Sequence, residues 1–202
     1  MKYEYEERAF LSEDDFLRIK DYLDKTAKGK EFDNKKSYFF VMPDCNLSVA
    51  VSDAKALVKY KSGQIAKGNG FEEHEFPFDP KSIDEAIGLF TSLAHIQPQQ
   101  SEQFRINYFL DGDIEIALKY TASWGFHIEI EKVYTATGEQ DKAEQQQIAQ
   151  NDVEAIVKLL DIKLITLADM DIFSKDCLSG INKGEFSPDE FRKKYGQLFT
   201  AE

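Results

Sequence analysis

The chain has little cysteine, and it lacks both long apolar runs and a secretory leader pattern. Its two cysteines, Cys45 and Cys177, lie far apart without a CxxC spacing, which favours free thiols over a disulfide framework. No stretch approaches the roughly 18 apolar residues of a membrane-spanning helix, and the acidic first residues include no apolar leader core. We therefore expect a cytoplasmic protein with no membrane partner.

Basic residues are outnumbered by acidic ones. The 202 residues include 25 Lys and Arg against 37 Asp and Glu, which gives a formal net charge of −12. A field of this sign repels nucleic-acid backbones and anionic membrane surfaces. The composition thus predicts no nucleic-acid partner, and an anionic ligand would need a local cluster of cations that overcomes the global field.

The signatures of several common enzyme classes are also missing. The sequence has no GxGxxG and no GxxxxGK[ST], which removes dinucleotide-binding and P-loop interpretations of any strength. Its histidines, His74, His95 and His127, lack the HExxH and H-x₃-H spacings of zinc sites. No Ser-His-Asp or Cys-His nucleophile arrangement can be assembled from the motifs.

The sequence does contain a series of short segments in which apolar and polar residues alternate, together with a few amphipathic helices. Helices are predicted at 12–26, 82–96 and 141–160, with Ser12 and Ser82 as N-caps. The order has no regular strand–helix repeat, so the fold class is α+β with a mostly antiparallel sheet. We expect a single domain over residues 1–202, with short C-terminal helices from about residue 168. Strands are predicted at 3–10, 35–44, 47–53, 56–63, 68–78, 102–111, 113–121 and 125–134.

Charged side chains recur on one face of these strands. In "YEYEERAF", residues 3–10, Glu4, Glu6 and Arg8 fall at every second position and share one side. Two interpretations fit this pattern: a sheet with one side in water, or a closed interior lined by charges. Five further strands repeat it, with charged faces that carry Lys59 and Lys61, Glu73 and Glu75, Arg105 and Asn107, Glu115 and Lys119, and His127, Glu129 and Glu131.

The residue types indicate what such an interior could bind. Paired carboxylates are the ligands that Mg²⁺ and Mn²⁺ prefer, since both are hard cations that take oxygen donors. Inward-facing Lys and Arg suit phosphate oxygens, Arg as a bidentate fork and Lys as a point charge. A site with both kinds of group would bind a metal–polyphosphate complex.

The order of these motifs resembles one protein family. "EYEER", residues 4–8, is similar to the ExExK signature that opens the CYTH superfamily of triphosphate tunnel metalloenzymes. "IEIALKYTASWGFHIEIE", residues 114–131, resembles the late hairpin of that family, which ends in E-x-E. Between them "VKYK", "EEHE" and "FRINY" follow the family order of basic, acidic and basic strands. The resemblance spans roughly residues 3–175.

The resemblance implies a fold and a set of site residues. The fold would be an antiparallel, eight-stranded closed β-tunnel covered by helices, and comparable bacterial members suggest a homodimer. A Mg²⁺ or Mn²⁺ cofactor is implied, with a small-molecule triphosphate or nucleotide as partner. The implied metal ligands, which would also be the catalytic residues, are Glu4, Glu6, Glu129 and Glu131. The implied substrate-binding residues are Arg8, Lys59, Lys61, Glu75, Arg105 and Lys119.

Three activities follow from the resemblance. The first is a metal-dependent phosphohydrolase acting on inorganic or organic triphosphates. The alternatives are a class IV-type adenylate cyclase and a non-catalytic protein that binds a phosphorylated ligand. The non-catalytic alternative is favoured by Lys119, which stands where the family usually carries Asp.

Overall fold

The computed structural model describes residues 2–42, 45–52, 55–62, 71–166, 168–170, 172 and 183–200, with only the backbone described at 41 and 71–73. The strands are β1 (Lys2–Phe10), β2 (Gly29–Phe32), β3 (Lys35–Val41), β4 (Cys45–Ser52), β5 (Ala56–Ser62), β6 (Phe71–Phe78), β7 (Gln99–Phe109), β8 (Ile114–Thr121) and β9 (Gly125–Thr135). The helices are α1 (Glu13–Thr26), α2 (Ile83–Ala94), α3 (Glu139–Leu160) and α5 (Pro188–Tyr195), with 3₁₀ turns at Pro80–Ser82 and Gly196–Phe199.

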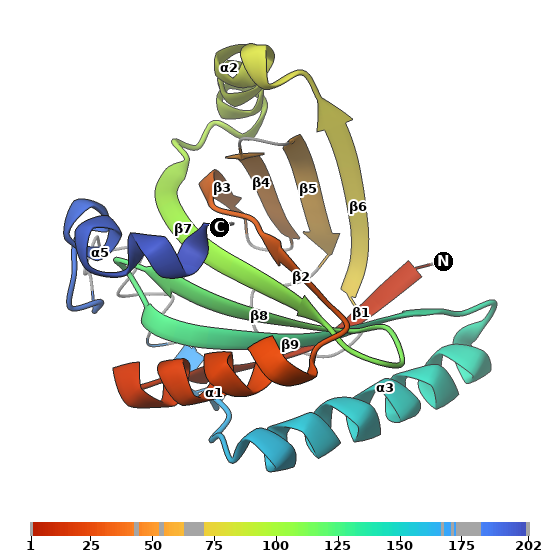
Figure 1. Cartoon of the computed structure of the whole chain (residues 1–202). Coiled ribbons are helices and arrows are strands. Elements are labelled where there is room, and N and C mark those ends of the chain that lie inside the picture. Colours follow the sequence, from red (N-terminus) through yellow and green to blue (C-terminus); the bar gives the residue numbers. More distant parts are fainter. Residues whose placement is uncertain are drawn as a thin grey trace.

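The nine strands form one antiparallel sheet in the order β2-β7-β3-β4-β5-β6-β1-β9-β8, and β8 pairs again with β7. Eight strands therefore follow one another around the sheet, while β2 pairs with the end of β7 that β3 leaves uncovered. Between β1 and β6 two residue pairs are in register within the described residues, which begin on this strand at Phe71. The sheet curls into a half-barrel (Figure 1). The predicted antiparallel α+β fold is confirmed.

The strand that the sequence did not reveal is β2. Its four residues, "GKEF", contain a single apolar side chain, so they show no alternation. They become a strand because their backbone pairs with Ile106–Phe109 of β7. Long-range pairing of this kind overrides the local signal.

The first helix forms where its cap and its apolar spacing place it. The Ser12 hydroxyl accepts a hydrogen bond from the Asp15 backbone N–H at 3.1 Å, which satisfies one of the unpaired donors of the first turn. Phe16, Ile19 and Leu23 recur at helical spacing and are fully buried. In this way α1 fixes its apolar stripe against the sheet.

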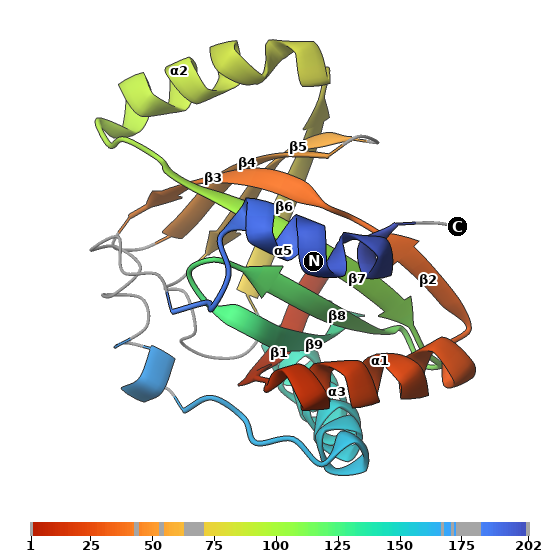
Figure 2. The same cartoon turned by 60° about the vertical axis from the view of Figure 1, so that its left-hand side comes forward.

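The helices divide between two ends of the molecule. Helix α3 packs on β9 and β1, and α2 lies at the opposite end beside β3 and β4 (Figures 1 and 2). The Phe90 ring of α2 meets the Phe40 ring of β3 with 6.1 Å between centroids. No helix in the described part of the chain is long and apolar enough to cross a bilayer.

Two expectations about the helices are wrong in detail. The Ser82 side chain makes no capping hydrogen bond, because a 3₁₀ turn capped by Asp79 precedes α2 and leads the chain into it. Helices also do not cover every apolar outer face. On β6, Phe76 is 67 % exposed, and on β5 Tyr60 is exposed.

Helix α5 packs against the hydrophobic core through aromatic side chains. Phe191 is fully buried and its ring stacks on Tyr120 with 3.8 Å between centroids. The same ring contacts Phe104, Phe126 and Phe199. Aromatic rings bury large apolar areas, so this contact set ties α5 to β7, β8 and β9.

We predict that Phe191→Ala lowers the free energy of unfolding by about 3–5 kcal/mol, since it removes a buried ring and leaves a cavity. Urea denaturation followed by circular dichroism measures this. Leu159→Ala, at a side chain that is 58 % exposed, serves as the control and should change the free energy by less than about 0.5 kcal/mol. A similar small effect of Phe191→Ala would contradict the packing described for α5.

Candidate functional site

The inner face of the sheet surrounds one cavity of about 440 Å³, a size typical of small-molecule sites. The Glu4 and Glu6 side chains are only 7 % and 2 % exposed, so the charged faces form an interior rather than a wall in water. All ten residues singled out from the sequence line this cavity: Glu4, Glu6, Arg8, Lys59, Lys61, Glu75, Arg105, Lys119, Glu129 and Glu131. Their roles in binding or catalysis stay predictions.

Strand β1 serves both sides of the sheet. Tyr5 and Ala9 are buried in the hydrophobic core, and the alternate residues face the cavity. The register of β1 with β9 sets Glu6 opposite Glu131 and Arg8 opposite Glu129. Acidic and basic groups of two strands are thereby brought side by side.

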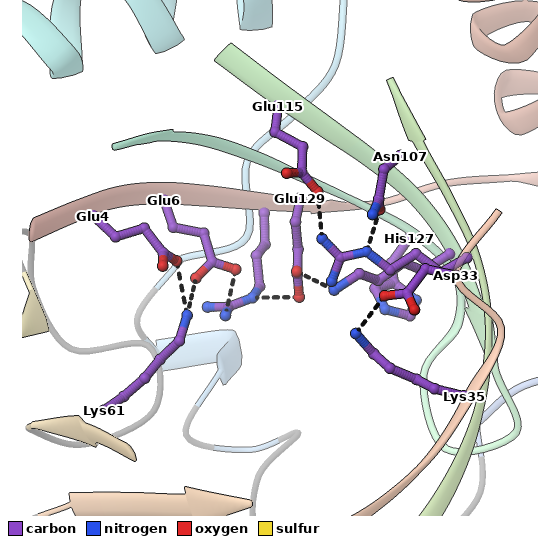
Figure 3. A network of polar contacts seen from close by, with 12 residues as sticks. Glu4, Glu6, Asp33, Lys35, Lys61, Asn107, Glu115, His127 and Glu129 are labelled. Carbon is purple, nitrogen blue, oxygen red and sulfur yellow. Dashed lines mark hydrogen bonds and ion pairs between the residues drawn. The ribbon is translucent and has the colours of Figure 1, made fainter. Parts of the chain in front are cut away.

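Ion pairs join these groups across the cavity (Figure 3). Lys61 Nζ lies 2.7 Å from Glu4 Oε1 and 3.4 Å from Glu6 Oε2. Arg8 uses Nη2 for Glu6 Oε1, at 2.6 Å, and Nε for Glu129 Oε1, at 3.1 Å. Three expected metal ligands are thus already bound to cations of the chain.

Lys119 completes the pairing of Glu129. It lies on β8 with its side chain buried, and its ammonium donates to Glu129 Oε2. Arg105 stands directly opposite it on β7 and donates from Nη2 to Glu115 Oε1 at 2.8 Å. Burial and the Arg105 charge lower the pKa of Lys119 to about 8.

The pKa values of the buried carboxylates Glu129 and Glu6 depend on the same nearby charges. Burial acts to raise the pKa of Glu129, but the charges of Lys119 and Arg8 hold it well below its usual range. Burial likewise opposes the ionised form of Glu6, and Arg8 and Lys61 lower its pKa. Nearby opposite charge therefore outweighs desolvation at both positions.

Glu131 behaves differently. Burial and the nearby Glu115 and Glu6 carboxylates raise its pKa to about 7. In the sheet Glu131 stands opposite Glu6 on one side and Glu115 on the other. Three carboxylate positions consequently form a row across β1, β9 and β8, where added positive charge would be stabilised.

Lys35 is a cavity residue that the sequence pattern did not identify. Its Nζ pairs with Asp33 Oδ2 at 2.9 Å, and burial together with the charges of Arg105, Lys119 and Lys59 lowers its pKa to about 7. The signal was present, because Lys35, Ser37 and Phe39 alternate in "KKSYFF" and all line the cavity. No second charge marks this face, however, because Ser37 and Phe39 occupy the positions that follow Lys35 on it.

Four cations therefore gather where β3, β5, β7 and β8 face the cavity: Lys35, Lys59, Arg105 and Lys119. Lys59 pairs with the partly exposed Glu75 on the neighbouring strand β6. We call these four residues the cation wall. Burial lowers the pKa values of Lys35 and Lys119, and repulsion by the nearby cations lowers them further, so an added anion would be stabilised there.

The described lining of the cavity is balanced in charge although the chain is strongly acidic. Among the described residues it includes eight basic and eight acidic side chains, whose formal charges cancel, whereas the chain carries −12. The basic ones are Lys2, Arg8, Lys35, Lys55, Lys59, Lys61, Arg105 and Lys119; the acidic ones are Glu4, Glu6, Glu31, Asp33, Glu75, Glu115, Glu129 and Glu131. The cavity therefore contains the local cluster of cations that an anionic ligand of this acidic chain would need.

The expected metal ligands do not fit a divalent ion in this arrangement. Within the described residues, no three Asp, Glu, His or Cys side chains converge on a point that could hold a metal. The oxygens of Glu4, Glu6 and Glu129 face ammonium and guanidinium groups instead. The Mg²⁺ or Mn²⁺ cofactor implied by the resemblance stays a prediction.

Comparison with known proteins gives the fold its context. No protein-family model matches the sequence, and no curated protein matches it. Among solved structures, the PH1012 protein of Pyrococcus horikoshii OT3 superposes with a TM-score of 0.61 at 20% identity, over 79% of this chain and 91% of that one. A candidate adenylate cyclase of Vibrio parahaemolyticus superposes with a TM-score of 0.60 at 16% identity, over 85% of this chain and 98% of that one.

A third solved structure is HpAC1 of Hippeastrum, a candidate adenylyl cyclase whose description reports a dominant triphosphatase activity. It superposes with a TM-score of 0.56 at 15% identity, over 87% of this chain and 96% of that one. At these identities the comparisons establish a shared fold. That fold is the one that the resemblance to the CYTH superfamily implied.

We predict that Glu129→Gln destabilises the protein by about 3–5 kcal/mol, because it leaves Arg8 and Lys119 buried without their shared counter-charge. Adding Lys119→Met should restore part of the loss, with a coupling of at least about 1 kcal/mol in a double-mutant cycle. Urea denaturation of the four proteins measures both quantities.

The control for this cycle is the exposed pair Lys25–Asp21, in which Lys25 Nζ lies 2.6 Å from Asp21 Oδ2. Asp21→Asn should cost less than about 1 kcal/mol, because exposed ion pairs contribute little. Additive effects of Glu129→Gln and Lys119→Met would show that the two groups do not interact as described.

Proposed function

Starting from the CYTH fold that this chain shares with these proteins, we propose that its cavity binds a triphosphate or the triphosphate group of a nucleotide. The observation that carries the proposal is the cation wall. Its four side chains come from four strands and face one enclosed space. Burial and the mutual repulsion of the cations lower the pKa of Lys35 and Lys119, and a phosphate chain would relieve that repulsion.

The donor chemistry of the wall supports the same ligand. Arg105 offers a planar fork of N–H donors, and the lysines offer compact ammonium charges. Three or four cations along one wall can be matched by an extended polyphosphate better than by a single anionic group. The carboxylates that now pair with these cations hold them in place until an anion replaces them.

Metal-dependent hydrolysis of the bound triphosphate is the second candidate. The row of Glu6, Glu131 and Glu115 places three carboxylate positions on neighbouring strands. A metal would have to displace Arg8 and Lys61 from Glu6, and Arg105 from Glu115, to use this row. A triphosphatase activity is described for HpAC1, one of the proteins with this fold. Cyclisation of ATP uses the same phosphate contacts with a ribose hydroxyl as nucleophile, so products distinguish it from hydrolysis.

We predict that tripolyphosphate raises the melting temperature of the purified protein and binds with micromolar affinity. Lys59→Met should weaken this binding by about tenfold, as expected for one lost charge-assisted contact. Lys28→Met, which removes an exposed lysine paired with Asp111 outside the cavity lining, is the matched control and should leave the affinity unchanged. Calorimetric titration gives all three affinities.

The same samples decide between the candidate activities. The protein is incubated with tripolyphosphate, thiamine triphosphate and ATP, in Mg²⁺, in Mn²⁺ and in EDTA. Orthophosphate release indicates a hydrolase, cyclic AMP indicates a cyclase, and binding without product indicates a binding protein. Absence of both binding and turnover with all three compounds would refute the proposed function.

We predict that binding weakens as the pH rises through the pKa of Lys35, about 7. Below that pH the ammonium form is present and attracts phosphate, and above it the charge is lost. The affinity of the wild-type protein, divided by that of Lys35→Arg, should fall by about tenfold between pH 6 and pH 8. The ratio cancels the titration of the ligand, because Arg stays charged throughout; a constant ratio would exclude this role for Lys35.

A further inference from the structure

We infer that the Lys119 ammonium takes the place of a divalent cation in this cavity, so that the cavity binds a polyphosphate without Mg²⁺ or Mn²⁺. This inference rests on the proposed function and specifies how its site works. It starts from the disagreement between the carboxylates that the sequence offers as metal ligands and the ion pairs in which the structure holds them.

A metal at a phosphate site bridges a protein carboxylate to a phosphate oxygen and offsets the charge of both. Lys119 is placed to do the same. Its ammonium is bonded to Glu129 Oε2, which uses one of its three donors. The side chain also lines the cavity directly opposite Arg105, so a further donor can reach an anion that Arg105 contacts.

The backbone arrangement gives the lysine the room to reach Glu129. Ala117 stands directly opposite Glu129 in the β8–β9 register and lies on the same face of β8 as Lys119, two residues along. Its methyl group is small, and both Ala117 and Lys119 are buried. The Lys119 ammonium therefore lies between Glu129 of β9 and the other members of the cation wall.

The remaining carboxylates are not available as an alternative metal site. Arg8 binds both Glu6 and Glu129, and Lys61 binds both Glu4 and Glu6. Among the described residues Glu131 forms no ion pair, but a single carboxylate is a poor protein-based site for these ions. A divalent ion approaching Glu129 would in addition be repelled by Lys119 and Arg8.

The first test measures tripolyphosphate affinity by calorimetry in EDTA and in excess Mg²⁺. We expect binding in EDTA to be at least as tight as in Mg²⁺, because no metal is needed and Mg²⁺ sequesters the free ligand. Binding that appears only when Mg²⁺ is added would overturn the inference. Absence of binding in both media would instead refute the proposed function, and the second test then still bears on Lys119.

The second test uses Mn²⁺ alone, with the free ion followed by electron paramagnetic resonance. The wild-type protein should bind no Mn²⁺ up to about 1 mM, and Lys119→Met should tighten Mn²⁺ binding by about tenfold or more, since it frees Glu129 and removes a buried positive charge. Lys119→Met/Glu129→Gln should lose the gained site. Tight Mn²⁺ binding by the wild type, or none by a folded Lys119→Met, would contradict the inference.

If Lys119→Met proves too unstable to study, Lys119→Arg tests the inference in its place. It retains a cation against Glu129, so it should gain no Mn²⁺ site and should bind tripolyphosphate in EDTA within about tenfold of the wild type. Circular dichroism of each variant reports its folding independently. Mn²⁺ binding by Lys119→Arg would mean that a cation at this position does not exclude the metal.

Discussion

The structure depends on the pairing of opposite charges inside a sheet. Ionised groups removed from water are costly unless a counter-charge and hydrogen bonds compensate them. Here Glu129 lies between Arg8 and Lys119, and Glu6 lies between Arg8 and Lys61. Each cation serves a carboxylate on another strand, so the pairs also hold β1, β5, β8 and β9 at fixed distances around the cavity.

This pairing explains why the interior stays open instead of filling with side chains. Apolar residues of the same strands pack outwards, where α1, α3 and α5 cover much of the sheet. Long charged side chains inside keep water or an ionic ligand near them and resist collapse. The cation wall and the carboxylate row then give the cavity two regions of opposite potential, which orients any ligand that carries charge along its length.

How much of this could be predicted from the sequence depended on the range of each interaction. The alternation in "YEYEERAF" predicted the first strand and its charged face, and the Ser12 cap with its apolar stripe predicted α1, because those signals lie within a few residues. Strand β2 could not be predicted, since only its pairing with β7 creates it. Lys35 shares its strand face with Ser37 and Phe39, so no second charge marks it. The partner of Glu4 lies 57 positions away, and no local pattern identifies such a pair.

The division of β1 between core and cavity has a consequence for how the sheet assembles. Side chains alternate between the two faces of a strand, so a shift of one residue in the pairing of β1 with β9 would turn Tyr5 into the cavity and Glu6 and Arg8 into the apolar core. Such a misregistered sheet would bury those charges away from their partners, at a large cost in free energy. The charged interior therefore also selects the correct strand register during folding.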